Sequence, residues 1–337
     1  GSHVGKISGG VTVEWIGDFV HEIRKPGSGG TEYIWLISGS GSKLILNGVT
    51  LKSDYTTGLT QAIYQQAGNS HELHDCTLSG TYQALVTLAN NCVSSVIDGL
   101  TINGSTRYIV RGNTASAMFD VWDWRNLSGE VTWCPALNAA FDNRIDVTAS
   151  GLLTTSRLWG MTGPGNMVLG SGTIGIEKSV FHGTKAYAIE AVSGVSTGVT
   201  FRNVAFTGFS SCGVRVSGAA LPGLIDYCGA WDCPALSNLA GFEGIHNVTA
   251  DPLFADYAGH DYRLTAGSPY LNAGTACVAT IDPDGVTIPQ GDAPDIGAFE
   301  YQQRPSVISG AGQGLAVDVR LDLAIDPATV GAPGDWT

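Results

Sequence analysis

Charged residues and long apolar segments are both scarce in this sequence. Asp, Glu, Lys and Arg make up 14% of its 337 residues, whereas about a quarter of an ordinary globular domain is charged. No segment approaches the roughly 20 consecutive apolar residues that a membrane-spanning helix needs, and we expect no membrane span. The 17 Lys and Arg residues are scattered, and the net charge is -13. Because such an acidic surface repels a phosphate backbone, the sequence argues against a nucleic-acid partner.

Cysteine pairs at metal-binding spacing are also missing. The seven cysteines include no Cys-x-x-Cys motif, which is a common spacing of structural zinc ligands, and we predict no metal site. An odd number of cysteines excludes complete pairing within the chain. We expect buried free thiols, which pack as small apolar side chains. A disulfide between Cys228 and Cys233 is the alternative.

The sequence is rich in glycine and in apolar residues. There are 46 glycines, and 43% of the residues are hydrophobic, which is ample for a packed core. No stretch longer than about two turns shows the apolar period of an amphipathic helix. This composition is typical of many short strands separated by turns, and it predicts an all-β fold.

Five segments share one pattern, in which an apolar residue is followed by a polar or small pair and then by an apolar stretch. They are residues 45–51, 73–78, 97–102, 176–181 and 201–206. Aligned apolar positions recur about every 25 residues, and the interval between the third and fourth segments fits three coils. This period is shorter than the roughly 40–45 residues of a propeller blade. It matches one coil of a three-sided β-solenoid, in which stacked coils bury an apolar stripe that no coil can bury alone.

Polar residues between the strands of the repeat mark the places where the coils turn. Asn47, Asp75, Asp98 and Asn203 occupy equivalent places in the alignment. Asn and Asp tolerate left-handed backbone and form local hydrogen bonds. The sequence therefore predicts a bend between two faces of the solenoid at these residues.

The last part of the repeat region carries an ordered series of motifs. They are Asp-Pro-Leu-Phe at 251–254, Asp-Tyr-Arg-Leu at 261–264, Gly-Ser-Pro at 267–269 and Pro-Asp-Ile-Gly-Ala-Phe-Glu-Tyr at 294–301. The series resembles the closing coil of the pectate-lyase-like right-handed parallel β-helix superfamily, which includes bacterial surface and phage tail-type proteins. The resemblance implies a parallel β-helix over residues 41–301, preceded by an N-terminal cap and first strands at 4–40.

The two ends of the chain have a different character. Residues 1–3 are expected to be a cloning remnant. Residues 302–337 begin with a linker and then alternate apolar and polar residues over 317–323, as a half-buried strand does. This last segment resembles the start of a bacterial immunoglobulin-like module.

A tryptophan-rich stretch is the first candidate site. If residues alternate along a strand, Asp120, Trp122 and Trp124 share one face. Exposed tryptophan beside a carboxylate suits a sugar ring, because the indole packs on its apolar face. With Trp133 and Trp159 nearby in sequence, the four tryptophans are candidate carbohydrate-binding residues. The alternative is that these side chains fill the interior of the solenoid.

Carboxylates of the same region could act as a hydrolytic pair. Glycosidases need two carboxyl groups about 5–5.5 Å or roughly 6.5–9.5 Å apart, and neighbouring coils are separated by about 4.8 Å. Asp120 or Asp123 on one coil and Asp142 or Asp146 on the next could meet this requirement. These four residues are therefore candidate catalytic residues, although acidic residues on solvated turns are far commoner.

Basic residues on later coils are candidates for lyase chemistry. A lyase needs a base beside a uronate carboxylate and a cation that neutralises this carboxylate. Lys178 and Arg202, with His182 and Lys185, lie about one repeat apart. We expect no cofactor, except that the resemblance implies calcium if the protein is a lyase.

The leading functional hypothesis is recognition of glycans outside the cell. The motifs resemble those of phage virion and bacterial surface proteins, so the implied partner is a polysaccharide or a cell-surface glycan and the implied location is extracellular, on a bacterial surface or a virion. The resemblance also allows a homotrimer. The alternatives are a polysaccharide lyase or glycoside hydrolase, and a purely structural shaft.

Overall fold

The computed structural model describes most of the chain and contains only β-structure there. The described residues are 3–16, 20–23, 32–53, 60–88, 92–112, 119–132, 144–145, 147–162, 167–169, 173–192, 198–217, 225–239, 241–302, 307–313 and 316–321. No helix occurs among them, and so none that is long and apolar enough to cross a membrane. The predicted all-β class is confirmed.

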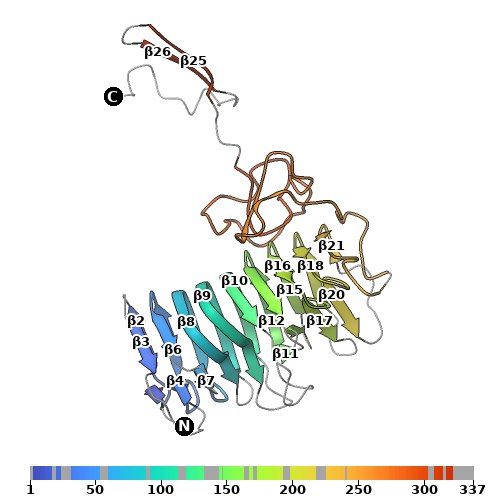
Figure 1. Cartoon of the computed structure of the whole chain (residues 1–337). Helices are drawn as coiled ribbons and strands as arrows, with labels where there is room; N and C mark the ends of the chain where they lie inside the picture. Colours follow the sequence, from blue (N-terminus) through green and yellow to red (C-terminus); the bar gives the residue numbers. More distant parts are fainter. Residues whose placement is uncertain are drawn as a thin grey trace. The chain divides into compact units, whose positions relative to one another are not determined.

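The strands stack in parallel ladders, one for each side of a coil (Figure 1). The first ladder contains β2 (Thr12–Ile16), β5 (Lys43–Asn47), β8 (Ser70–Leu88), β9 (Cys92–Gly112), β10 (Phe119–Thr132), β12 (Val147–Thr154), β15 (Thr173–Glu177), β18 (Gly198–Arg202) and β21 (Ile225–Asp226). The second contains β3 (Val20–Ile23), β6 (Thr50–Ser53), the later parts of β8, β9 and β10, then β13 (Arg157–Thr162), β16 (Val180–Gly183), β19 (Ala205–Thr207) and β22 (Gly229–Trp231).

The third side is built in two parts. The first part contains β1 (His3–Ile7), β4 (Glu32–Ile37) and β7 (Thr60–Gln65), followed by the ends of β8 and β9. The second part is a separate parallel sheet of β11 (Arg144–Ile145), β14 (Met167–Leu169), β17 (Ile189–Val192) and β20 (Val214–Ser217). The whole arrangement is a parallel β-solenoid.

The pairing register gives the coil length directly. Ile102 pairs with Gly129, Gly129 with Leu158, and Leu158 with Phe181. These pairs confirm the three coils that were expected between the third and fourth repeat segments, and a length of about 25 residues per coil.

One inward position of the successive coils from β5 to β21 forms a continuous apolar column. Its members pair successively in the first ladder and are at most 1% exposed: Leu46, Leu73, Ile97, Trp124, Leu153, Ile176, Phe201 and Ile225. Burying each such side chain stabilises the fold by about 1.5–3 kcal/mol relative to leaving it in water. The column is therefore the main reason that coils of unequal length stay in register.

The bend between the first two ladders uses left-handed backbone at one residue per coil. The residues are Gly48, Asp75, Gly99, Asn126, Thr155, Lys178, Asn203 and Tyr227, with φ between 44° and 79°. We call them the bend column. The prediction was right for Asp75 and Asn203 but wrong for Asn47 and Asp98, which each precede the bend by one residue. At both places a glycine follows, and glycine adopts positive φ without the steric cost of a Cβ atom.

Free thiols line the interior and its edges. Cys76, Cys92, Cys212 and Cys228 are buried, and none of the six described cysteines forms a disulfide. The alternative Cys228–Cys233 bond is therefore absent. Burial raises the pKa of the Cys228 thiol to about 12, which keeps the group protonated and chemically inert at neutral pH.

After β22 the chain makes one more irregular turn of the solenoid, in which Ser237, Glu243 and Val248 each form an isolated parallel bridge to the preceding coil. It then ends in two further elements. An antiparallel hairpin, β23 (Phe254–Asp256) and β24 (Asp261–Leu264), is followed by irregular chain to residue 300. We call residues 270–300 the strap. Residues 301–337 form a second unit, in which β25 (Val307–Gln313) pairs with β26 (Ala316–Leu321). The second of these hairpins, β25 and β26, contains the strand that was expected at residues 317–323. The immunoglobulin-like module stays a prediction.

A polar network inside the solenoid is satisfied only by a neutral imidazole. The ring of His71 contacts the amide oxygen of Gln65 through Nδ1 and the hydroxyl of Ser95 through Nε2, at 2.7 Å for the latter. The same hydroxyl accepts the indole N–H of Trp124 at 2.8 Å. His71 therefore donates from Nδ1 and accepts at Nε2. Burial lowers the pKa of His71 to about 3, because a charged ring would lose its hydration.

This network predicts that the protein loses stability in mild acid. The pKa of His71 lies below its ordinary value of about 6.5, so the unfolded chain binds a proton that the folded protein excludes. Stability should fall as the pH decreases from about 6.5 towards 3, by roughly 2 kcal/mol between pH 7 and pH 5. Urea unfolding at both pH values measures the change. A His71→Gln variant should lose this part of the pH dependence, whereas His74→Gln, on the outer side of the same strand, should keep it. An equal slope in all three proteins would contradict the assignment.

Candidate functional site

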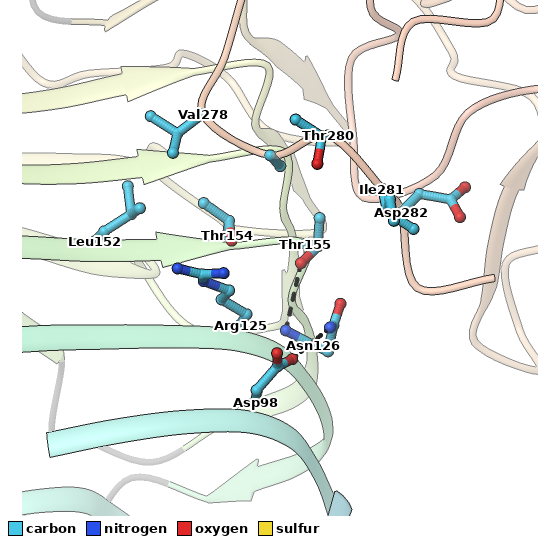
Figure 2. A pocket seen from close by; sticks show the side chains of 11 residues that line it. Asp98, Arg125, Asn126, Leu152, Thr154, Thr155, Val278, Thr280, Ile281 and Asp282 are labelled. Atoms are coloured by element: carbon cyan, nitrogen blue, oxygen red, sulfur yellow. Dashed lines mark hydrogen bonds between the residues drawn. The ribbon is translucent and has the colours of Figure 1, made fainter. Parts of the chain in front are cut away.

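A cavity lies between the bend column and the strap. It has a volume of about 280 Å³, and its walls come from β9, β10 and β12 on one side and from residues 278–282 on the other (Figure 2). We call it the bend pocket. Its two walls are far apart in sequence, so only the folded chain forms it.

The floor of the bend pocket presents hydrogen-bond acceptors. Asn126, in left-handed backbone at φ 55°, donates its side-chain N–H to Asp98 at 2.7 Å. The amide oxygen of Asn126 is buried and has no hydrogen-bond partner. A buried polar atom without a partner costs about 1–3 kcal/mol, so this oxygen is suited to accept a hydrogen bond from a ligand or a bound water.

An arginine beside this floor is held in place by an ion pair. Arg125 donates from Nε and Nη2 to the two carboxylate oxygens of Asp123, at 3.0 and 2.7 Å. The hydrogen bonds to Asp123 raise the pKa of Arg125, and the charges of Asp123 and Asp98 act in the same direction. The guanidinium is half-exposed, and one of its nitrogens, Nη1, has no hydrogen bond to the described part of the chain.

The rim of the bend pocket is apolar and open to solvent. Val278 and Ile281 of the strap are 62% and 54% exposed, and Leu152 of β12 contributes from the opposite wall. Thr154 and Thr155 lie between rim and floor, and the hydroxyl of Thr155 accepts the backbone N–H of Asn126 at 3.4 Å. Polar groups below and apolar groups above can together hold a ligand with both kinds of surface.

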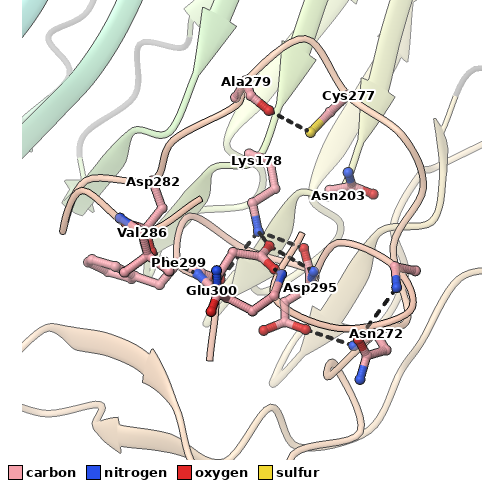
Figure 3. A network of polar contacts seen from close by, with 12 residues as sticks. Lys178, Asn203, Asn272, Cys277, Ala279, Asp282, Val286, Asp295, Phe299 and Glu300 are labelled. Carbon is pink, nitrogen blue, oxygen red and sulfur yellow. Dashed lines mark hydrogen bonds and ion pairs between the residues drawn. The ribbon is translucent and has the colours of Figure 1, made fainter. Parts of the chain in front are cut away.

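A buried ion pair fixes the strap to the solenoid. Lys178 has no exposed surface, and its Nζ donates to Glu300 Oε1 at 2.7 Å and to the carbonyls of Asp295 and Phe299 at 2.8 and 3.2 Å (Figure 3). The carboxylate of Glu300 also accepts the backbone N–H groups of Asp295 and Gln290. The predicted catalytic role of Lys178 is therefore wrong, because all three of its donors hold the strap and none faces solvent.

Two further contacts place the rim over the bend column. The side chain of Asn203 donates to the carbonyl of Thr275 at 2.6 Å and accepts its N–H at 2.8 Å. Glu177 accepts the N–H of Val278 at 2.8 Å. These contacts come from consecutive coils, so the position of residues 275–278 depends on the solenoid register.

The predicted sugar-binding role of two tryptophans is also wrong. Trp122 and Trp124 are fully buried and pack edge to face, with ring centroids 5.3 Å apart. The expected alternation along β10 is present, but this row faces the interior, because the larger apolar side chains gain more from burial. Asp123 faces outward on the same strand. The alternative, that these tryptophans fill the solenoid, is the arrangement in the structure.

Several other candidates fall outside the described residues. These are Trp133, Asp142 and Asp146, together with the side chain of Asp120, and their roles stay predictions. Arg202 is exposed on β18, between Glu177 of β15 and Asp226 of β21 in the ladder. Lys178 is buried beneath the strap and its donors are taken by Asp295, Phe299 and Glu300, so the structure does not bring it together with the exposed Arg202.

Trp159 is part of an aromatic and histidine cluster on the second ladder. It is half-buried and stacks on His260, with ring centroids 5.1 Å apart and an angle of 19°. The hydroxyl of Tyr262 contacts Nδ1 of His182 at 2.8 Å and Nδ1 of His260 at 3.1 Å. Burial and the neighbouring His260 lower the pKa of His182 to about 4, so its ring is neutral at pH 7.

A β-bulge presents this tryptophan. Trp159 and Gly160 together lie opposite His182, since Leu158 pairs with Phe181 and Met161 with Gly183. Bulges change the direction of a side chain and are frequent beside functional sites. Among the described residues, no group of three or more His, Cys, Asp or Glu side chains is placed to hold a metal ion.

Sequence reasoning missed most of the bend pocket. Asn126, Thr155, Val278 and Ile281 carry no motif, and Asp98 was noticed only as a bend residue. The one available signal was the alignment of the repeat, because Asn126 occupies the bend position of its coil. The strap residues had no signal at all, since nothing in the repeat indicates where an irregular segment returns.

Comparisons with known proteins show a likeness to solved structures and to no family or curated protein. No protein-family model matches the chain, and no curated protein matches it either. Among solved structures, the chain is similar to pectate lyase Pel9A, with 12% sequence identity and a TM-score of 0.37. The match covers 84% of this chain and 77% of that chain.

Removing the buried lysine should strongly destabilise the protein. In Lys178→Met, the Glu300 carboxylate stays buried without its counter-charge, and breaking such a pair costs about 3–5 kcal/mol. Urea unfolding measures this loss. Lys178→Met combined with Glu300→Gln should be less destabilised than the single variant. Lys43→Met is the control, because Lys43 and Glu72 form a half-exposed ion pair at 2.6 Å of a kind that contributes about 1 kcal/mol or less. Equal losses in Lys178→Met and Lys43→Met would contradict the assignment.

Proposed function

We propose that this protein is an extracellular carbohydrate-binding β-solenoid of a bacterial surface or a phage particle, and that the bend pocket holds one sugar unit of a polysaccharide or cell-surface glycan. The observation that carries the proposal is an acceptor-lined floor below an exposed apolar rim, in one cavity of about 280 Å³. A sugar unit has hydroxyl groups around its edge and apolar C–H groups on its faces, so it matches both.

The volume of the bend pocket suits a small ligand. Pockets for drug-sized ligands measure roughly 300–1,000 Å³, and about 280 Å³ lies at the lower limit of this range. One sugar ring fits this limit better than an extended chain does. The remaining units of a glycan would therefore lie outside the pocket.

The setting outside the cell rests on the sequence motifs at 251–301. They resemble the closing coil of surface and virion β-helix proteins, and a homotrimer is the assembly that this resemblance allows. Sedimentation analysis of the purified protein tests the trimer independently of glycan binding. The motifs include Glu300 and the strap around it, so they also bear on how the pocket forms.

Variants of the pocket should weaken glycan binding. A glycan array identifies a ligand, and calorimetry then measures its affinity for Arg125→Ala and Ile281→Ala. We expect each variant to bind about tenfold more weakly, because about 1.4 kcal/mol is lost with a polar or apolar contact. Ile245→Ala is the matched control, since Ile245 is 90% exposed and is not part of the pocket wall. Unchanged affinity in both pocket variants would contradict the proposal, and absence of any glycan ligand would favour a structural shaft.

The arrangement of His182, Tyr262 and His260 favours a second candidate function, cleavage of the glycan by lyase or hydrolase chemistry. The hydroxyl of Tyr262 has one proton, so it donates to one imidazole and accepts from the other. The imidazole that donates from Nδ1 keeps an unprotonated Nε2, which can act as a base.

Incubation with neutral and acidic polysaccharides separates binding from cleavage. We expect no new reducing ends and no unsaturated products from the wild-type protein, since binding is the leading proposal. Product formation that falls by about 100-fold or more in His260→Ala would establish the second function instead. Arg202→Ala is the control, because Arg202 is exposed on β18 and lines neither this cluster nor the bend pocket in the described structure.

A further inference from the structure

We infer that the bend pocket selects a neutral or amino sugar and rejects a uronic acid. This inference rests on the proposed function and adds the chemical class of the ligand. It follows from two independent properties of the pocket, which are its charge balance and the kind of hydrogen-bonding groups that remain free.

The charge balance of the pocket is negative. Asp98, Asp282 and Arg125 line it, and Asp123 lies in contact with Arg125. Three carboxylates thus face one guanidinium, which leaves a formal charge of -2. The guanidinium is already occupied by Asp123 through two hydrogen bonds. It is therefore poorly placed to form the bidentate pair by which arginine usually recognises a carboxylate.

The next charged groups do not change this balance. Arg157 and Arg263 lie over the ring of Phe299 at 5.0 and 4.9 Å. Arg263 is paired with Asp261 and Asp284. The two positive charges of Arg157 and Arg263 are therefore balanced by the two negative charges of these aspartates. The charges of Lys178 and Glu300 cancel, because the two side chains form an ion pair. The formal charges of Glu177 and Arg202, which are paired positions of adjacent strands, also sum to zero.

The free hydrogen-bonding groups of the pocket floor are acceptors, and the free donor nitrogen Nη1 of Arg125 lies beside them. The amide oxygen of Asn126 is buried without a partner. Asp98 uses Oδ1 to accept from Asn126, which leaves its second oxygen for a ligand. Asp282 is saturated, because it accepts the N–H groups of Asp284, Val286 and Glu300. A ligand must therefore supply donors, which hydroxyl, amide and ammonium groups do and an ionised carboxylate does not.

The two properties act in the same direction. A uronate would place its negatively charged acceptor oxygens against the acceptors and negative charges of the pocket, and the like charges repel each other. A neutral sugar avoids the repulsion, and the ammonium group of an amino sugar gains an attraction to Asp98. The apolar rim of Val278 and Ile281 contacts the C–H face of either kind of sugar and does not discriminate between them.

A matched pair of ligands tests the inference with charge as the variable. Oligogalacturonate and its fully methyl-esterified form share one backbone and differ in the carboxylates. Calorimetry with the full-length protein should show the ester binding at least about tenfold more tightly than the acid at low salt. High salt should reduce this ratio, because it screens the repulsion. A glucosamine oligomer should bind more tightly than its N-acetylated counterpart.

Two variants assign the discrimination to the pocket. In Asp98→Ser, the ratio of ester to acid affinity should fall towards one, because a negative charge has been removed. Asp292→Ser should leave the ratio unchanged, since Asp292 is exposed in the strap and does not line the pocket. A loss of discrimination in both variants would overturn the inference.

The outcomes also separate this inference from the proposed function. If the wild-type protein binds the acid as tightly as the ester, and Ile281→Ala weakens both, the pocket binds sugars and the inference about their charge is wrong. If Ile281→Ala changes no affinity, or no ligand binds, both the inference and the proposed function fail. Discrimination that is lost only in Asp98→Ser supports both.

Discussion

In-register parallel stacking of the coils is the constraint on which the rest of the structure depends. Each coil contributes one inward side chain to a column that runs from Leu46 to Ile225, and neighbouring coils satisfy each other's backbone hydrogen bonds. A slip by one residue would turn every inward side chain of a strand to the other face. Trp122 and Trp124 would then be exposed and Asp123 buried, so the register is fixed by a large difference in burial.

Left-handed backbone in the bend column converts this stacking into a surface that the strap can recognise. Because each coil turns at an equivalent residue, the side chains of Lys178 and Asn203 leave consecutive coils at matching places. The strap binds both, through Glu300 and Thr275. The ion pair of Lys178 and Glu300 has no exposed surface, and it therefore depends on complete hydrogen bonding of both groups. This contact keeps residues 275–282 close to the solenoid.

The bend pocket is a consequence of that closure. Where the bend residue is Asn126 or Thr155, the strap does not bind the side chain and leaves a cavity. The same backbone geometry thus serves two purposes, because coils at 178 and 203 anchor the strap and coils at 126 and 155 face the space beneath it. The buried amide oxygen of Asn126 and the open rim of Val278 and Ile281 give this space its chemical character.

The sequence by itself determined the all-β class, the coil length and the three coils between residues 102 and 181, because burial of one stripe per coil forces apolar residues to recur. It also indicated the left-handed bend at Asp75 and Asn203. It could not determine which row of β10 faces inward, since alternation defines two rows but not their direction. Only the tertiary structure decided that Lys178 anchors the strap and that Asp98, Asn126 and Ile281 share a pocket. These contacts join segments distant in the chain, and an irregular strap has no periodicity from which its position could be calculated.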